Sequence, residues 1–100
     1  MKLGILVNTD RHEDYLSGIT KAAVAMGHDV IIFVMDDGTR LLNRPVMRDL
    51  CGIPGVSISF CDMNARQCGL DREDLPPSIV CGSQYNNAVM NHEADRVIVL

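Results

Sequence analysis

Five short apolar runs, spread along the chain, constrain its fold more strongly than any other feature of the sequence. The runs are rich in Val and Ile, and they cover residues 3–7, 30–35, 56–60, 78–81 and 97–100. Short apolar runs of this kind are typical of strands that are covered on both faces, as in a parallel sheet. The chain is therefore expected to contain five strands.

The segment between the first two runs changes to a helical period. Apolar residues recur there at the spacing of an amphipathic helix: Leu16, Ile19, Ala22, Ala23 and Met26. Asp10 and Glu13 are spaced as an N-terminal capping box, and Gly27 is placed to end the helix in the left-handed conformation. This part of the chain is predicted to form a strand-helix-strand unit.

The rest of the chain continues the alternation. Turns are expected at residues 36–38 and 52–55, with a short helix after Pro45 between them and a polar loop at residues 71–77. Residues 62–68 are expected to form a short helix that ends at Gly69. A last helix should run from the Ser83 cap to about His92, with Ala88, Val89, Tyr85 and His92 facing inward. We therefore predict an α/β fold with residues 1–100 in one domain: a three-layer α/β/α sandwich around a five-stranded, mostly parallel sheet.

The charge balance argues against two classes of partner. Thirteen acidic and nine basic side chains give a net charge of −4, and no run of Lys or Arg is long enough to hold a phosphate backbone, so nucleic acid is not expected. The apolar runs fall far short of the roughly 20 residues that a bilayer span needs. The first residues lead directly into a strand-like run without the features of a signal peptide. A cytoplasmic protein with no membrane partner is expected.

In an open parallel sheet, ligands and reactive groups collect beyond the carboxyl ends of the strands. The first such loop, residues 8–12, has no glycine and carries acidic groups, and neither a dinucleotide G-x-G-x-x-G motif nor a Walker loop occurs anywhere in the chain. A flavodoxin-like FMN site is disfavoured for the same reason, and because there are only two Tyr, two Phe and no Trp. No cofactor is expected.

Cys61 is the strongest candidate for a reactive residue. It directly follows the third apolar run and precedes a predicted helix, whose N-terminal amides favour a thiolate. Asp62 opposes a second negative charge, and Arg66 offsets it if its side chain folds back. On this reasoning, Asp62→Asn is expected to speed the alkylation of Cys61. The alternative reading is that Cys61 is a small apolar residue of the core.

The other three cysteines have simpler readings. Cys81 ends the fourth run, so it is a candidate for a resolving or relay thiol if the third and fourth strands are neighbours; otherwise it is a small buried residue. Cys68 lies two helical turns after Cys61, too far for a disulfide within an intact helix, and core packing explains it. Cys51 closes a predicted helix and is also read as a core residue.

His12 and the four cysteines are the remaining candidates, for a general base and for a zinc site. His12 lies in the first strand-to-helix loop, and it is a candidate base for Cys61 if the first and third strands are neighbours. Structural zinc sites contain paired C-x2-4-C knuckles. The cysteines at 51, 61, 68 and 81 contain no such pair. No metal is expected.

The sequence around Cys61 resembles the DsrE/DsrF-like family of small sulfur-relay proteins, which includes the TusD-type subunits. The segments that carry the resemblance are Gly4-Ile5-Leu6-Val7-Asn8-Thr9, Ala25-Met26-Gly27-His28-Asp29-Val30, Phe33-Val34-Met35-Asp36-Asp37-Gly38, Ile58 to Leu70 with Asp74-Leu75, and Glu93-Ala94-Asp95-Arg96-Val97-Ile98. The resemblance implies an α/β/α fold, a homotrimer or hexamer, and a cysteine at the end of the third strand that accepts sulfane sulfur and passes it to a partner. The matching position is Cys61.

Three functions follow as hypotheses. The first is a cytoplasmic, sulfurtransferase-like sulfur carrier in which Cys61 holds a persulfide between donor and acceptor proteins, with amides near Asn64 stabilising the anion. The second is a non-catalytic oligomeric binding subunit of the same fold. The third is a thiol redox protein in which Cys61 and Cys81 form a disulfide.

Overall fold

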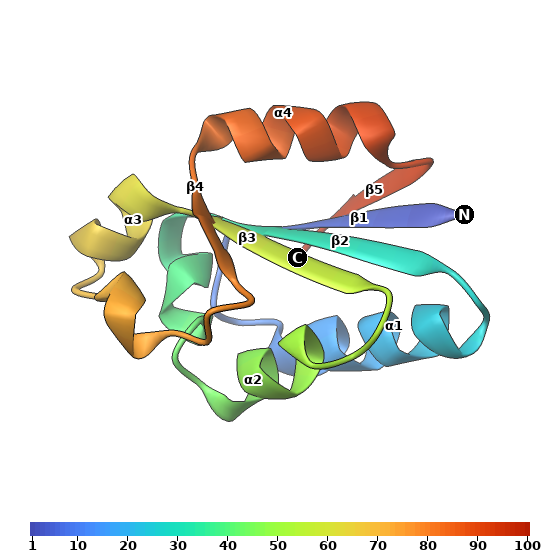
Figure 1. Cartoon of the computed structure of the whole chain (residues 1–100), viewed down its shortest axis with the longest axis horizontal. Coiled ribbons are helices and arrows are strands. Elements are labelled where there is room, and N and C mark those ends of the chain that lie inside the picture. Colours follow the sequence, from blue (N-terminus) through green and yellow to red (C-terminus); the bar gives the residue numbers. More distant parts are fainter.

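The five apolar runs form the strands of one sheet in the computed structural model, which describes residues 1–100. The strands are β1 (Lys2–Val7), β2 (Asp29–Val34), β3 (Val56–Cys61), β4 (Val80–Gly82) and β5 (Arg96–Val99). They lie in the order β4-β3-β2-β1-β5, and all four pairings are parallel. All five strands therefore end at the same edge of the sheet, where the connecting loops meet (Figure 1).

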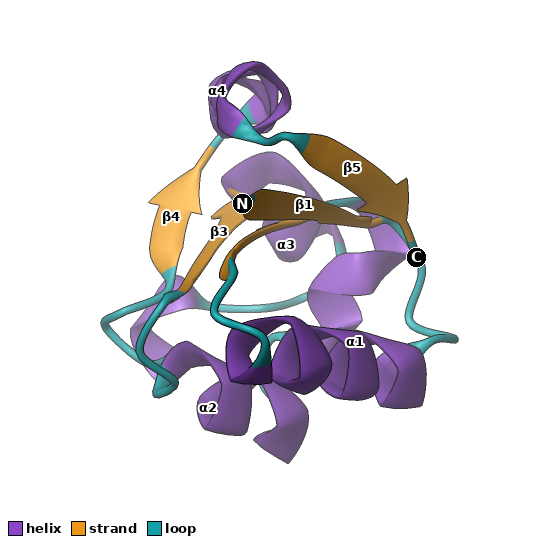
Figure 2. Cartoon of the chain, turned by 90° about the vertical axis from the view of Figure 1, so that its right-hand side faces the viewer, coloured by secondary structure: helices purple, strands orange, loops and turns teal.

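The helices cover both faces of the sheet. Helices α1 (Glu13–Ala25) and α2 (Pro45–Cys51) lie on one face and α4 (Gln84–Glu93) lies on the other, as Figure 2 shows. A short helix, α3 (Asp62–Gln67), follows β3 directly, and two 3-10 segments, η1 (Asp36–Leu41) and η2 (Arg72–Asp74), precede α2 and β4. The predicted three-layer α/β/α sandwich is confirmed. No helix combines the length and the apolar character that crossing a bilayer requires.

Two apolar clusters fill the spaces between the layers. The larger one joins the sheet to α1 and α2 and includes Leu16, Leu50 and Phe60. The smaller one lies under α4 and consists of Phe33, Cys61 and Met90. Because successive side chains of a strand point to opposite faces, the neighbours Phe60 and Cys61 belong to different clusters. This alternation decides which side of the sheet each candidate thiol faces.

Helix boundaries mostly follow the predicted signals. Pro45 is the first residue of α2, where its missing N–H leaves no intrahelical bond unmade. Gly27 and Gly69 follow α1 and α3 with φ angles of 85° and 77°. L-residues with a side chain rarely adopt that conformation, so glycine ends both helices as predicted.

The predicted capping box of α1 was wrong. The helix begins at Glu13 with His12 as its N-cap, and no side chain caps it. Asp10 and Glu13 instead approach the Arg44 guanidinium, at 3.8 Å and 3.7 Å. These contacts hold the two carboxylates against the segment before α2 and away from the N-terminal amides of α1.

Some predicted inward-facing residues are also exposed. In α1 the buried residues are Leu16, Thr20 and Ala23, while Ala22 and Met26 face solvent. In α4 only Met90 is buried. Tyr85, Ala88 and His92 are exposed, and Val89 is half-buried. The buried stripe is narrow because each helix touches the sheet along one line, so residues beside that line stay in solvent.

Candidate functional site

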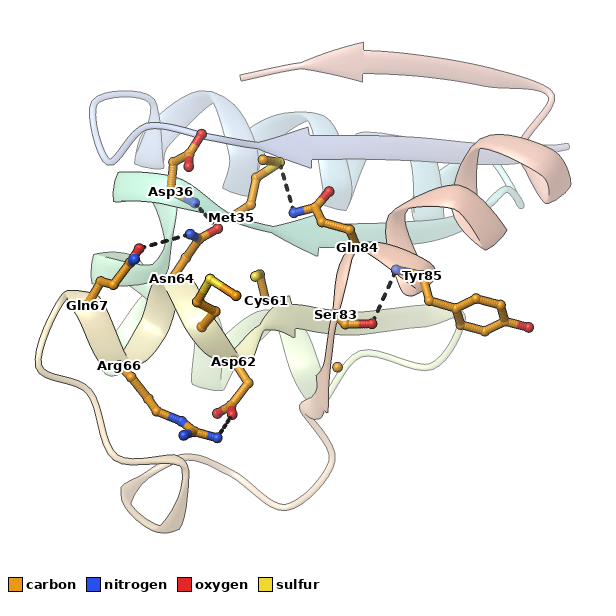
Figure 3. Close-up of a pocket in the computed structure, with 12 residues that line it drawn as sticks. Met35, Asp36, Cys61, Asp62, Asn64, Arg66, Gln67, Ser83, Gln84 and Tyr85 are labelled. Atoms are coloured by element: carbon orange, nitrogen blue, oxygen red, sulfur yellow. Dashed lines mark hydrogen bonds and ion pairs between the residues drawn. The ribbon is translucent and has the colours of Figure 1, made fainter.

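The largest cavity of the molecule lies at the carboxyl ends of β2, β3 and β4. Its volume is about 970 Å³. The residues that line it come from the end of β2, from Cys61 and α3, and from the start of α4: Met35, Asp36, Cys61, Asp62, Met63, Asn64, Arg66, Gln67, Gly82, Ser83, Gln84 and Tyr85 (Figure 3). We call this cavity the Cys61 pocket. It occupies the sheet edge at which the sequence predicted chemistry.

Cys61 lies where the sequence placed it. It is the last residue of β3 and the N-cap of α3, with extended backbone angles of −79° and 111°. Its side chain belongs to the cluster under α4 and is 6% exposed. In Figure 3 the sulfur points toward Met35 and away from the Asp62 carboxylate. The thiol thus lies at the inner end of the pocket, with a small surface open to it.

Asn64 ties α3 to the end of β2. Its Oδ1 accepts a hydrogen bond from the Asp36 N–H at 3.0 Å, and its Nδ2 donates to Gln67 Oε1 at 3.2 Å. Asp36 has a φ angle of 48°, the only positive value outside glycine. That conformation is strained for a residue with a side chain. Asn64 therefore supports the pocket wall, and its side-chain amide is occupied there.

The opposite wall is the first turn of α4. The predicted Ser83 cap is confirmed: Ser83 Oγ accepts from the Tyr85 N–H at 3.2 Å, and Asn86 Oδ1 accepts from the Ser83 N–H at 3.0 Å. A Cβ atom on Gly82 would lie 2.2 Å from Asn86 Oδ1, so glycine lets this capping box close. Gln84 Nε2 approaches Met35 Sδ at 3.8 Å and links this wall to the end of β2.

Asp62 and Arg66 form an ion pair across one turn of α3. The hydrogen bond from Arg66 is the main cause that holds the pKa of Asp62 below its ordinary value. Desolvation opposes it, while the Cys81 thiol and the Arg72 charge reinforce it. The same bond raises the pKa of Arg66. Arg66 therefore folds back as predicted, but the pair lies away from the Cys61 sulfur.

Cys81 faces the other side of the sheet. Strands β3 and β4 are neighbours, as the relay hypothesis required, but their register pairs Cys81 with Phe60 and Gly82 with Cys61. Paired residues point to the same face. Cys81 accordingly packs against the α1 and α2 cluster, with Arg72 Nη1 3.9 Å from its sulfur. All four cysteines are free, and a Cys61–Cys81 disulfide cannot form without rearranging β4.

His12 does not reach Cys61. Strand β2 separates β1 from β3, so the condition for its predicted role as a base is not met. His12 instead lies 5.9 Å from the Tyr15 ring and lines a separate cavity of about 470 Å³ with the end of β5. The strand order, which local patterns do not reveal, accounts for this wrong prediction.

The two remaining cysteines, Cys51 and Cys68, are half-buried. The Cys68 thiol approaches the Asp36 carbonyl oxygen at 3.9 Å, and the Cys51 thiol approaches the Arg48 carbonyl oxygen at 3.3 Å. No group of three His, Cys, Asp or Glu side chains is placed to hold a metal ion.

Sequence reasoning missed Met35 and Gln84 as pocket residues. Their signal was positional, since each lies within two residues of a strand end at the same sheet edge.

Comparisons with known proteins support the fold. No protein-family model matches the chain, and no curated protein matches it. A solved structure of a protein of unknown function, MTH1491 from Methanobacterium thermoautotrophicum, is similar with a TM-score of 0.72 and 18% identity, covering 99% of this chain and 98% of that one. The ychN protein from E. coli is similar with a TM-score of 0.73 and 16% identity, covering 99% and 97%. At these identities the likeness shows a shared α/β fold.

Proposed function

We propose that this protein is a cytoplasmic sulfur carrier that holds sulfane sulfur as a persulfide on Cys61. The observation that carries the proposal is the position of this thiol, at the end of β3 and at the inner end of the largest cavity. The resemblance of the surrounding sequence to the DsrE/DsrF-like family supports the same assignment. By that resemblance, the carrier works as a homotrimer or hexamer between donor and acceptor proteins.

The transfer needs only thiol chemistry. The Cys61 thiol releases its proton to solvent, and the thiolate attacks the outer sulfur of a donor persulfide. One sulfur-sulfur bond forms as the donor's breaks, and the donor leaves as a thiolate that takes up a proton. An acceptor thiolate then attacks the outer sulfur of the Cys61 persulfide and regenerates the Cys61 thiolate. The two steps involve no net oxidation.

The pocket supports this chemistry in two ways. Cys61 lines the pocket and is 6% exposed as a residue, so a persulfide on it would project into the pocket while the inner sulfur stays shielded. Shielding slows the reaction of a persulfide with solvent oxidants, which depends on exposure. Met63 and Tyr85, which line the pocket, are 68% and 74% exposed, so a partner's chain can contact them.

The test compares the two strand-end cysteines. Reduced protein is incubated with polysulfide, and intact mass reports the added sulfur atoms. Wild type and Cys81→Ser should gain sulfur on the peptide that contains residue 61, and Cys61→Ser should gain none on that peptide. Loading that persists in full in Cys61→Ser would remove the proposal.

A binding subunit is the second candidate, favoured by the open, partly apolar mouth formed by Met63 and Tyr85. It predicts that wild type fails to load sulfur while remaining folded and oligomeric. Size-exclusion chromatography with light scattering, run beside the mass measurement, separates this outcome from a carrier that was inactivated by misfolding.

A further inference from the structure

The Cys61 pocket contains more sulfur than a carrier thiol requires. Met35 follows β2, Cys61 ends β3 and Met63 is the second residue of α3, so three separate positions bring sulfur to one cavity. Met35 also packs against the buried cluster that contains Cys61. Met63, in contrast, is 68% exposed at the mouth. The chain has six methionines, and two of them line this cavity.

We propose that this pocket binds Cu(I) through the Cys61 thiolate and the thioethers of Met35 and Met63. Thiolate and thioether are soft ligands, which select Cu(I) over hard cations such as Mg²⁺ and Ca²⁺. Cysteine spacing gave no reason to expect a structural zinc site, and no three His, Cys, Asp or Glu side chains converge. Thioethers fall outside both criteria, so neither one bears on a Cu(I) site.

The charge of the pocket fits a monovalent ion. One Cu⁺ and one thiolate sum to zero, which suits a largely buried sulfur in a poorly hydrated position. The Asp36 and Asp62 carboxylates also line the pocket, but they are hard ligands, which a soft Cu(I) ion does not select. Arg66 is the only Lys or Arg side chain that lines the pocket, and its guanidinium is paired with Asp62. No cation therefore competes at the sulfur.

Assembly of the site requires the Met35 and Met63 side chains to rotate toward Cys61. Met63 is exposed, and methionine has three rotatable side-chain bonds, so its sulfur is free to turn inward. Met35 Sδ has one weak contact to give up, the 3.8 Å approach of Gln84 Nε2. On binding, the Cys61 thiol releases one proton to solvent, and copper stays in the +1 state throughout.

Cu(I) binding and persulfide formation therefore compete for the Cys61 sulfur. A Cu(I) ion on Cys61 occupies the electron pair that would attack a persulfide, so the metal-loaded and sulfur-loaded forms exclude one another. The inference goes beyond the carrier function and does not rest on it, because metal binding needs only the three sulfur atoms.

The test is an anaerobic titration of the reduced protein with Cu(I) in competition with bicinchoninate. Met35→Leu and Met63→Leu keep the side-chain volume close to that of methionine. Each should weaken Cu(I) binding by about tenfold or more, the order of effect seen when support for a metal ligand is lost. Met26→Leu, at an exposed methionine after α1, is the matched control and should bind as wild type. X-ray absorption should show sulfur ligands only.

Two outcomes would overturn the site. One is a wild type that binds no Cu(I). The other is a Met35→Leu, Met63→Leu double variant that binds as tightly as wild type, which would mean that a thiol alone captures the ion. Circular dichroism of each variant confirms folding. Polysulfide loading of metal-free wild type is measured separately, so a protein that loads sulfur without binding Cu(I) contradicts this inference and leaves the carrier function standing.

Discussion

The thiols of Cys61 and Cys81 lie at the ends of neighbouring strands, yet their surroundings differ in almost every respect. Cys61 faces the α4 side, in a cavity lined by thioethers, amides and the Asp36 and Asp62 carboxylates, and its sulfur points away from the Asp62 carboxylate. Cys81 faces the α1 and α2 side, with the Arg72 guanidinium 3.9 Å from its sulfur. The Cys81 thiol also helps to lower the pKa of the Asp62 carboxylate.

The contrast shows that the alternation of side chains along a strand, and not proximity in the sequence, decides which charged groups lie near each thiol. Asp62 adjoins Cys61 in sequence, but its carboxylate points away from the Cys61 sulfur and pairs with Arg66, and the Cys81 thiol helps to lower its pKa. The Asp62–Arg66 pair is therefore coupled electrostatically to Cys81. The next experiments break or sharpen this division between the two faces.

The largest effect is expected from removing the aromatic support of each face. Phe33 shares the cluster of Cys61, and Phe60 is the register partner of Cys81; both are fully buried. Phe→Ala in a core lowers the free energy of unfolding by about 3–5 kcal/mol. Phe33→Ala should also speed the alkylation of Cys61 more than that of Cys81, and Phe60→Ala should do the reverse. Urea unfolding and peptide mapping after iodoacetamide measure the two effects.

Each of the two variants is the matched control for the other, because each one creates a cavity on the opposite face of the sheet. The alkylation is run at low temperature, well below the unfolding transition, so that it reports local opening. If both variants accelerated both cysteines equally, the faces would not be independent and the comparison would fail.

Most of the fold was readable because its signals are local. The apolar runs predicted all five strands, and Gly27, Pro45 and Ser83 marked helix ends by their own backbone or side-chain chemistry. The strand order is set by which crossovers pack together, and no short segment encodes that choice. The role predicted for His12 failed on this point, since β2 lies between β1 and β3.

The candidate site was predictable at one residue and not at its neighbours. The strand-to-helix junction located Cys61 directly. Which face Cys81 takes depends on the β3–β4 register, and a shift of one residue reverses it. Met35 and Gln84 meet only because two separate loops reach the same edge of the sheet, so their 3.8 Å contact depends on the tertiary structure. Local sequence patterns carry no information about such contacts.

A smaller, electrostatic effect is expected from Arg72→Gln. One charge about 4 Å away contributes on the order of 1 kcal/mol in water, or about fivefold in rate. The variant should slow the reaction of Cys81 with an anionic aromatic disulfide by about that factor, and it should leave Cys61 unchanged. High salt should reduce the difference. Arg11→Gln, at an exposed cation on another loop, is the control. Equal slowing of both cysteines would show that Arg72 acts on the whole surface.

The smallest effect is expected from Asp62→Asn, and it corrects the sequence expectation that this change speeds the alkylation of Cys61. The carboxylate points away from Cys61, so the rate there should stay the same while that of Cys81 rises. Because Arg66 holds the pKa of Asp62 below its ordinary value of 3.8, the ionised carboxylate stabilises the folded state above that pH, and this contribution is lost as pH falls through the lowered value. Urea unfolding should therefore show a stability difference between wild type and variant that is present at neutral pH and disappears on acidification. The difference will be small, since Arg66 is mostly exposed. A faster Cys61 in the variant would mean that the Asp62 carboxylate does act on the Cys61 thiol and that the two faces share one electrostatic field.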